Sequence, residues 1–357
     1  MSDARCQTLL VKHDDPATTR AADAAVPTPD DGQTLVRVQR FALTANNVTY
    51  AVLGEQLGYW QFYPHEAPWG VVPVWGFGEV IEDRGGSIEV GTRLYGYFPL
   101  ASHALLQLAP AGPGGWKETS AHRQPLAGVY NRYQAIAAGD EDADNRRALL
   151  HPLLATAFLI ADFLDDNDCF GAHRVLLGSA SSKTALCLAQ LLRGGNAEVL
   201  GLTSPGRIDT VRATGAHARV LAYGDIDELE TDVPSVFVDM GGNAAVRDSL
   251  HRRLGDQLKY SCAVGLSHWD AQAPVPRDLP GPRPQMFFAP ARSKQRAQDW
   301  GPAELQRRIE QAYTDCAAAS RAWLSPRELR GIDAIAEQWL ATVRVEVPAE
   351  LGLIALP

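Results

Sequence analysis

The sequence predicts an α/β protein made of two parts, a small β-barrel and a parallel sheet flanked by helices. The first 110 residues are rich in short strand patterns separated by glycine and proline, which is typical of a small barrel. From about Tyr130 onward, strand and helix patterns alternate, which is typical of a parallel sheet. A buried strand at 175–177 runs through a short polar loop into an apolar helix, which is typical of a nucleotide-binding sheet.

The barrel is predicted from four segments near the N-terminus. Short strand patterns occur at Thr8–Val11 and Leu35–Arg40. Val71–Ile81 is a third strand pattern, broken by glycine, and Gly91–Phe98 reads as a turn followed by a strand. Short strands with this punctuation favour a barrel over a layered α/β sheet.

The parallel sheet is predicted from the alternation of strand and helix patterns that follows the apolar helix expected at Arg147–Leu164. Alternating strands and helices imply right-handed crossovers between parallel strands. A loop with five prolines is expected at 273–284, then helices at 302–323 and 326–341 and a final strand at Val343–Val347. The alternating units are strand 175–177 with helix 183–193, strand 197–202 with helix 206–214, strand 219–222, strand 235–239 with helix 243–254, and strand 258–264.

The loop after strand 175–177 is a candidate anion site. Free backbone N–H groups and the positive end of the helix dipole point at one spot there, and a dinucleotide pyrophosphate is the usual occupant. The glycine fingerprint of such loops is replaced here by Ser179, Ser182 and Ala185, and Lys183 lies at the start of the helix.

Two other interpretations of this loop stay open. A phosphate-binding P-loop needs a glycine before its Lys-Ser/Thr pair, but Lys183 stands where that glycine belongs, so the loop is one residue short. Alternatively, the segment is an ordinary strand-to-helix connection in which the serines only cap the helix.

The net charge, the apolar segments and the cysteine spacing of the sequence argue against several classes of protein. The net charge of −9 argues against a general nucleic-acid binder and against an anionic membrane surface. No apolar run of membrane-spanning length and no signal peptide are recognised, so a soluble, cytoplasmic protein is expected. The five cysteines are scattered and form no Cys-x-x-Cys pair, so neither a zinc site nor a redox dithiol is indicated.

Several motifs carry a resemblance to a known superfamily. Thr34–Asn47 is similar to an early strand with an Asn-containing turn, and Gly91–Gly96 to a Gly-Asp-Arg-Val-x-Gly motif. Val175–Ala185 matches a Val-Leu-Val-x-Gly-Ala-x-Gly-Gly-Val-Gly segment, and Val238–Gly242 resembles Phe-Asp-x-x-Gly-Gly. Together they resemble the medium-chain dehydrogenase/reductase superfamily, in particular its zinc-free, quinone-reductase-like branch.

A narrower resemblance is to the DUF2855 family, which has no established activity. It rests on Ser179–Thr184, Thr44–Tyr50, Val74–Phe77, Leu94–Phe98 and Val129–Asn131.

The resemblance implies a Rossmann-type parallel sheet domain and a smaller GroES-like β-barrel domain. The barrel domain, which would hold the substrate, is expected to comprise 1–130 and 291–357, and the dinucleotide-binding domain 131–290. The cysteine and His-Glu ligands of zinc-dependent relatives have no counterpart here, so no metal is expected. Relatives commonly dimerise, which makes a homodimer an expectation from resemblance.

NADP(H) is the expected cofactor. An NAD site places a carboxylate at the end of the second strand, but Thr203-Ser204 stands there and Arg207 follows. In NADP-dependent relatives a serine, a basic residue and a tyrosine hold the 2′-phosphate, which here implies Ser204, Arg207 and Tyr223. The remaining cofactor-binding candidates are Ser179, Ser181, Ser182, Lys183, Thr184, Gly241, Gly265 and Phe288.

The expected chemistry is hydride transfer to a small molecule. The cofactor supplies the hydride, while the protein must donate a proton or hydrogen bond to developing negative charge. Tyr50, Asn47 and Tyr130 are the candidate donors. The sequence therefore predicts a metal-free reductase of a quinone or a carbonyl-conjugated C=C bond. The competing hypothesis is a non-catalytic protein of the same fold that binds a dinucleotide or another anion as a sensor or partner domain.

Overall fold

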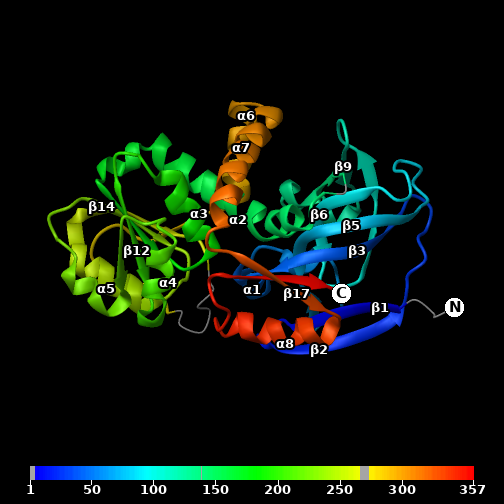
Figure 1. Cartoon of the computed structure of the whole chain (residues 1–357), viewed down its shortest axis with the longest axis horizontal. Coiled ribbons are helices and arrows are strands. Elements are labelled where there is room, and N and C mark those ends of the chain that lie inside the picture. Colours follow the sequence, from blue (N-terminus) through cyan, green and yellow to red (C-terminus); the bar gives the residue numbers. More distant parts are fainter. Residues whose placement is uncertain (1–4, 138, 266–272) are drawn as a thin grey trace. The chain divides into compact units, whose positions relative to one another are not determined.

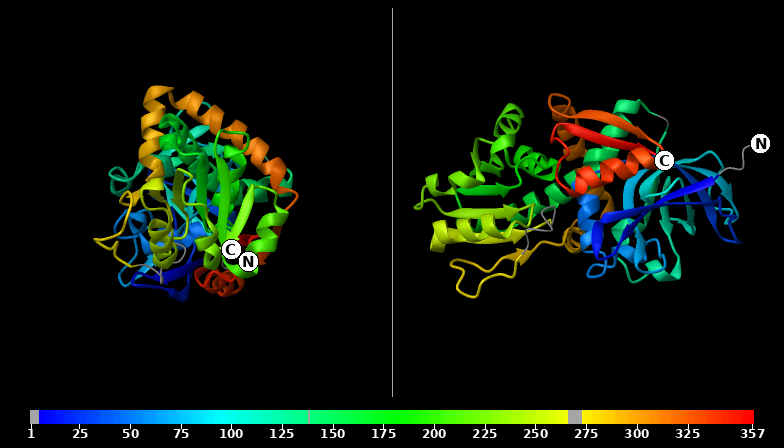
Figure 2. Two further views of the ribbon diagram at one scale, coloured as in Figure 1. Left: turned by 90° about the vertical axis from the view of Figure 1, so that its left-hand side faces the viewer. Right: turned by 90° about the horizontal axis from the view of Figure 1, so that it is seen from below.

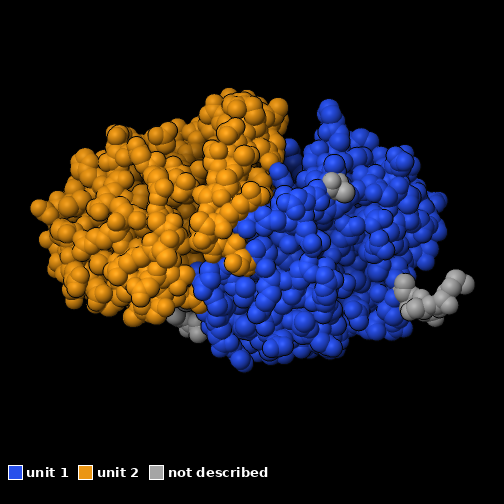
Figure 3. All heavy atoms as spheres, viewed as in Figure 1, with its two compact units in different colours: residues 1–149, 326–357 blue, residues 150–325 orange. Residues whose placement is uncertain are grey.

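The structure is a computed structural model that describes residues 5–137, 139–265 and 273–357 (Figure 1). The chain divides into two compact units, shown in different colours in Figure 3. Unit 1 comprises Met1–Leu149 and Pro326–Pro357, and unit 2 comprises Leu150–Ser325.

Unit 1 is built around antiparallel strands. A nine-stranded sheet has the order β17-β18-β3-β5-β6-β10-β9-β8, with β7 paired to β3, and β2-β1-β4 forms a separate three-stranded sheet. On β5, Gly76 lies so close to β3 that a Cβ atom would come within 2.2 Å of the Arg40 carbonyl oxygen, so the strands require glycine there. The strands are β1 (Arg5–Lys12), β2 (Asp15–Ala25), β3 (Thr34–Leu43), β4 (Trp69–Val71), β5 (Pro73–Asp83), β6 (Arg93–Pro99), β7 (His103–Leu106), β8 (Leu108–Pro110), β9 (Gly115–Glu118), β10 (Arg132–Ala135), β17 (Ser325–Arg330) and β18 (Leu351–Leu356).

Two α-helices of unit 1 pack on these strands. Helix α1 (Ala45–Val52) follows β3 and starts with a capping box formed by Thr44 and Asn47. Helix α8 (Ile332–Val343) lies beside β2 in Figures 1 and 2, and the buried Trp339 indole donates to the Pro16 carbonyl oxygen at 2.7 Å. Short 3-10 turns lie at η1 (Tyr59–Gln61), η2 (Ala121–Arg123) and η3 (Gly128–Asn131).

Unit 2 contains a six-stranded parallel sheet with the order β13-β12-β11-β14-β15-β16. In sequence these are the third, second, first, fourth, fifth and sixth strands of the unit, which is the order of dinucleotide-binding sheets. The order reverses between β11 and β14, and ligands bind at the carboxyl ends of strands at such a point. The strands are β11 (Arg174–Gly178), β12 (Glu198–Thr203), β13 (Arg219–Ala222), β14 (Ser235–Asp239), β15 (Leu258–Ala263) and β16 (Gln285–Met286), and the helices are α3 (Lys183–Leu192), α4 (Ile208–Ala213), α5 (Ala244–Leu254), α6 (Ala289–Asp299) and α7 (Pro302–Ser320).

The predicted α/β class is confirmed, and most predicted elements are present. The strands expected at 219–222 and 235–239 have the predicted bounds, and the expected loop at 273–284 contains no helix or strand. Two predictions near the C-terminus are wrong. The helix expected at 326–341 is instead β17 followed by α8, because Pro326 and the left-handed Gly331 (φ 81°) separate an extended segment from the helix.

The strand predicted at Val343–Val347 is also wrong. Its alternating valines resemble a strand, but Val343 is the last residue of α8 and Val345 has a left-handed backbone with φ of 58°. The strand that follows is β18, whose Leu353, Ile354 and Ala355 are buried against β3.

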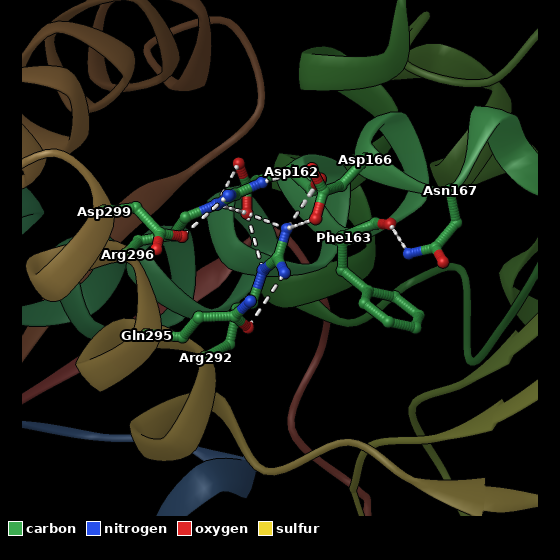
Figure 4. Close-up of polar contacts among 8 residues, drawn as sticks. All are labelled: Asp162, Phe163, Asp166, Asn167, Arg292, Gln295, Arg296 and Asp299. Atoms are coloured by element: carbon green, nitrogen blue, oxygen red, sulfur yellow. Dashed lines mark hydrogen bonds and ion pairs between the residues drawn. The ribbon is translucent and has the colours of Figure 1, made fainter.

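The division into units differs from the expected domain bounds. Residues 291–325 were expected in the barrel domain, but they group with unit 2, while 131–149 group with unit 1. Helix α6 is held to the rest of unit 2 by ion pairs. Arg292 and Arg296 on α6 pair with Asp162 and Asp166 on α2 (Glu141–Asp166), as Figure 4 shows.

Helix α2 is the one helix of the described residues that is long and apolar enough to cross a membrane. Half of its most apolar window is buried inside the protein, and the core helix of a soluble protein passes the same test. A single such helix is weak evidence for a membrane span.

Candidate cofactor and active site

The point where the strand order of unit 2 reverses is lined by Gly178, which ends β11, and Asp239, which ends β14. A Cβ atom on Gly178 would lie 3.1 Å from the Phe237 ring and 3.2 Å from Asp239 Oδ1. Glycine therefore allows the loop after β11 to leave the sheet close to β14.

Ser179 begins this loop with a left-handed backbone, φ 51°. A non-glycine residue there carries a steric cost of roughly 1–2 kcal/mol. The Ser179 N–H donates to the Tyr223 hydroxyl at 3.2 Å, and the Ser182 N–H donates back to the Ser179 carbonyl oxygen at 2.8 Å. The next residue, Ala180, is fully buried and donates its N–H to the Leu202 carbonyl oxygen. The serine loop is therefore an ordered turn.

The loop opens helix α3 as predicted from the sequence. The Ser182 hydroxyl accepts the Ala185 N–H at 3.2 Å, so Ser182 is the N-cap. Ser181, Lys183 and Thr184 are half-buried around the first turn. The loop and first turn of the helix thus carry one lysine and several hydroxyl-bearing residues, a composition suited to an anion at a helix N-terminus.

The three residues expected at a 2′-phosphate lie near the ends of β12 and β13. Ser204 and Arg207 are half-buried and flank the short turn after β12. Tyr223 follows β13 and contacts Ser179. Burial raises the pKa of the Tyr223 phenol, and the positive charge of Arg207 acts in the opposite direction. The structure therefore brings Ser179, Tyr223 and Arg207 into one neighbourhood.

Gly241 and Gly265 meet around Asp239. Oδ1 of Asp239 accepts the N–H groups of Gly241 and Gly242, both at 2.9 Å, and burial raises the pKa of the Asp239 carboxyl. A Cβ atom on Gly265 would lie 2.5 Å from the Met240 carbonyl oxygen, so this close approach requires glycine. Phe288 is the N-cap residue of α6 and lies after β16.

The candidate proton donors lie in unit 1, within an aromatic cluster. Tyr130 stacks on Tyr97 with ring centroids 4.6 Å apart, and Tyr50 packs against Tyr59 at 4.5 Å. Trp75 contacts the Tyr97 ring at 5.1 Å. Burial raises the pKa of all four phenols, which are therefore neutral donors at ordinary pH.

The hydroxyl groups of this cluster differ in their partners. The Tyr59 and Tyr130 hydroxyls are 3.2 Å apart and share a hydrogen bond. The Tyr50 hydroxyl accepts the Asn46 side-chain amide at 2.7 Å and the Trp75 indole N–H at 3.3 Å. The Tyr97 hydroxyl is buried beside the Tyr50 hydroxyl, and this contact acts to lower the pKa of Tyr50. Each hydroxyl group of the cluster can both donate and accept a hydrogen bond.

Asn47 has a different environment from Tyr50 and Tyr130. Its side chain accepts the Thr44 N–H at 2.8 Å and donates to the Pro73 carbonyl oxygen at 3.2 Å, so the amide fixes the start of α1. Its neighbour Asn46 contacts the Tyr50 hydroxyl instead. Sequence reasoning missed Asn46 and Tyr97. The four-residue spacing of Asn46 and Tyr50 on one helix face could have identified Asn46.

No group of three or more His, Cys, Asp or Glu side chains that could hold a metal occurs within 5–137, 139–265 and 273–357.

Comparison with solved structures shows the fold. A protein from Mesorhizobium loti described as an NADPH:quinone reductase matches with a TM-score of 0.64 at 14% identity, over 100% of both chains. CurA from Vibrio vulnificus, solved in complex with NADPH, matches with a TM-score of 0.64 at 12% identity, over 99% of each chain. A thermostable alcohol dehydrogenase from Pyrobaculum aerophilum has a TM-score of 0.58 at 13% identity, over 99% of this chain and 100% of its own.

These similarities confirm a Rossmann-type sheet domain with a GroES-like domain, the fold of medium-chain dehydrogenases/reductases. Among curated proteins, none matches the sequence. A family model described as "Protein of unknown function (DUF2855)" matches residues 41–348. Because this match covers most of the chain, the protein belongs to the DUF2855 family.

Proposed function

We propose that the protein is an NADP(H)-dependent, metal-free oxidoreductase that reduces a quinone or a carbonyl-conjugated C=C bond. The observation that carries the proposal is the strand order of unit 2, with an ordered serine loop and a helix N-terminus at the point where that order reverses. A dinucleotide is the usual ligand of this arrangement. The CurA structure, of similar fold, was solved with NADPH.

The residues present fit a dinucleotide with a 2′-phosphate. The close approaches at Gly178 and Gly265 leave backbone where side chains would otherwise fill the edge of the sheet. Ser204 and Arg207 follow β12 without a carboxylate at the strand end, so no negative charge there repels a phosphate. Ser181, Ser182, Lys183 and Thr184 would hold the pyrophosphate at the start of α3.

The chemistry of the proposed reaction is divided between cofactor and protein. NADPH supplies a hydride when bound. The tyrosine cluster of unit 1 supplies neutral hydroxyl donors for the oxygen on which negative charge develops, and Tyr50 and Tyr130 are the proposed donors. The buried aromatic rings exclude water from these hydroxyls, which strengthens their hydrogen bonds.

A second candidate is a non-catalytic protein that binds a dinucleotide or another anion. One observation favours it: the Tyr223 hydroxyl already occupies the Ser179 N–H, one of the backbone donors that a pyrophosphate would use. Under this hypothesis, inorganic pyrophosphate binds at the α3 N-terminus and no NADPH is oxidised.

The cofactor proposal is tested by calorimetric titration with NADPH and NADH. We expect tighter binding of NADPH, and Arg207→Ala should remove a difference of about 1–3 kcal/mol because a charge-assisted phosphate contact is lost. Arg212→Ala is the matched control, since Arg212 lies on the adjacent helix α4 and is exposed. Equal affinity for both cofactors in the unmodified protein would contradict the proposal. Binding of pyrophosphate alone would favour the second candidate.

A further inference from the structure

Two cysteines of unit 2 are in contact, although 129 residues separate them in the chain. Cys187 lies on α3 and Cys316 on α7, two helices that contact each other and are labelled in Figure 1. Both are free thiols, and their sulfur atoms are 3.1 Å apart and share a hydrogen bond. The spacing of the cysteines in the sequence does not indicate this dithiol, because the fold and not a local motif brings the two residues together.

The position of the two sulfur atoms suits a disulfide. The sulfurs of a disulfide are about 2.05 Å apart, so an approach of about 1 Å completes the bond. This shift is small beside the distance of about 8–10 Å between the axes of packed helices. Cys187 is fully buried and Cys316 is 3% exposed, so the Cys316 side of the pair is nearer to solvent.

The contact makes the two thiols unequal in acidity. The thiolate is the reactive form of cysteine, and a neighbouring S–H can donate to it. The hydrogen bond with Cys187 lowers the pKa of Cys316, whereas the same hydrogen bond and burial raise the pKa of Cys187. Burial raises the pKa of Cys169, and it raises the pKa of Cys262 to about 12. Cys316 is therefore the cysteine of unit 2 that ionises most readily.

We propose that Cys187 and Cys316 are a peroxide-sensitive dithiol, in which Cys316 is oxidised first and the resulting disulfide fixes α7 to α3. The cross-link joins α3, which begins at the candidate anion loop, to α7, the last helix of unit 2. This inference goes beyond the proposed reductase activity and does not depend on it.

The oxidation balances in atoms and electrons. The Cys316 thiolate attacks one oxygen of hydrogen peroxide, the O–O bond breaks, and Cys316 becomes a sulfenic acid while hydroxide leaves and takes up the proton that Cys316 had lost. The Cys187 sulfur then attacks the Cys316 sulfur, and the S–O bond breaks. The Cys187 proton leaves with that oxygen as water. In sum, two thiols are oxidised to one disulfide, and one peroxide is reduced to two molecules of water.

The first test counts thiols and needs neither cofactor nor substrate. The reduced protein is treated with hydrogen peroxide, unfolded, and alkylated with N-ethylmaleimide for intact mass measurement. We expect five alkylated thiols before treatment and three after it, with peptide mapping showing a Cys187–Cys316 link that dithiothreitol removes. Cys262→Ser is the matched control, because Cys262 is another buried cysteine of unit 2, and this variant should still lose two thiols. Five alkylated thiols after treatment, or a link between other cysteines, would overturn the inference.

Two serine variants test the order of the steps. Cys187→Ser keeps a hydroxyl donor beside Cys316 but removes the sulfur that closes the disulfide. In this variant, peroxide should leave added oxygen on Cys316, as peptide mass mapping would show. In Cys316→Ser, Cys187 should stay unmodified under the same treatment. Added oxygen on Cys187 in the second variant and none on Cys316 in the first would overturn the assignment of Cys316 as the sulfur oxidised first.

Thermal melts test whether the disulfide fixes α7. A link across so long a stretch of chain restricts the unfolded state, so the melting temperature of the oxidised protein should rise by roughly 5–10 °C. Dithiothreitol should reverse the rise, and Cys316→Ser should show no rise with peroxide. An unchanged or lower melting temperature of the cross-linked protein would overturn the fixing of α7. The thiol count and the linked peptide come from the unmodified chain, so they test the disulfide even if a serine variant does not fold.

Discussion

At the scale of single residues, Ser179 shows how a serine can stand where glycine is usual. Its left-handed backbone is supported by the Tyr223 hydroxyl and by the Ser182 N–H. The sequence identifies the loop and its serines, because strand, loop and helix are adjacent in the chain. It does not identify the bond to Tyr223, since that contact depends on how β13 lies beside β12 and β11. Local sequence patterns do not determine contacts between segments that are far apart in the chain.

His217 leads to a prediction about acid stability. Both of its ring nitrogens are buried without a hydrogen-bond partner in the described residues, and burial lowers its pKa to about 4. The unfolded chain, with an ordinary histidine pKa near 6.5, binds the proton more readily. The free energy of unfolding should therefore fall as the pH drops from about 6.5 toward 4, by on the order of 1–2 kcal/mol at pH 5 from this residue.

The test is urea unfolding of the wild type and of His217→Leu at pH 7 and pH 5. We expect the variant to lose less stability than the wild type between the two pH values. His65→Leu, which changes an exposed histidine, should retain the wild-type loss. The same loss in His217→Leu and the wild type would show that His217 does not titrate as expected.

At the scale of elements, long and strongly patterned segments were predictable and the C-terminal segment was not. The strands and helices between 174 and 263 repeat a βαβ pattern, so each supports the assignment of the next. Residues 325–356 lack this support. Strand β17 lies at the edge of its sheet and only Leu329 of its six residues is fully buried, so its hydrophobic pattern is weak. The segment forms a strand because it pairs with β18, and its own sequence pattern does not indicate that pairing.

The contact between α2 and α6 supports a prediction about stability. Asp162 accepts Arg292 Nε at 2.7 Å and Arg296 Nε at 2.9 Å, and the side chains of both arginines are almost fully buried (Figure 4). Asp162→Asn removes the more buried of the two carboxylates that both guanidinium groups face, and the partly exposed Asp166 remains. Because the buried arginines then lose part of their charge compensation, we expect a loss of about 1.5–3 kcal/mol in the free energy of unfolding.

Chemical denaturation measures this change, and Glu304→Gln is the control. Glu304 also faces two arginines, Arg307 and Arg308, but on an exposed helix surface where solvent screens the charges. We expect the control to change stability far less than Asp162→Asn does. Equal effects of the two substitutions would mean that burial does not strengthen the α2–α6 contact.

At the scale of the whole molecule, the distribution of potential metal ligands along the chain bears on whether the protein binds a metal ion. The five cysteines are far apart in sequence, and the described residues bring no three potential ligands together. We therefore expect no stoichiometric zinc in the purified protein, and a melting temperature that a chelator leaves unchanged. Elemental analysis and thermal melts with and without chelator test this. One zinc ion per chain, or a large chelator-dependent shift, would contradict it.

The pairing of β18 with β3 has a consequence for how the protein is made. The ribosome produces β3 early, but the partner of its Phe41–Leu43 end is synthesised only after all of unit 2. Until then, that stretch of the nascent chain keeps backbone N–H and C=O groups unpaired at an open strand edge, which invites pairing with other chains. Unit 2 is continuous in sequence and needs no later segment to complete its sheet. Translation therefore favours the second unit as the first to mature, and it leaves the N-terminal unit in need of protection until the last strand emerges.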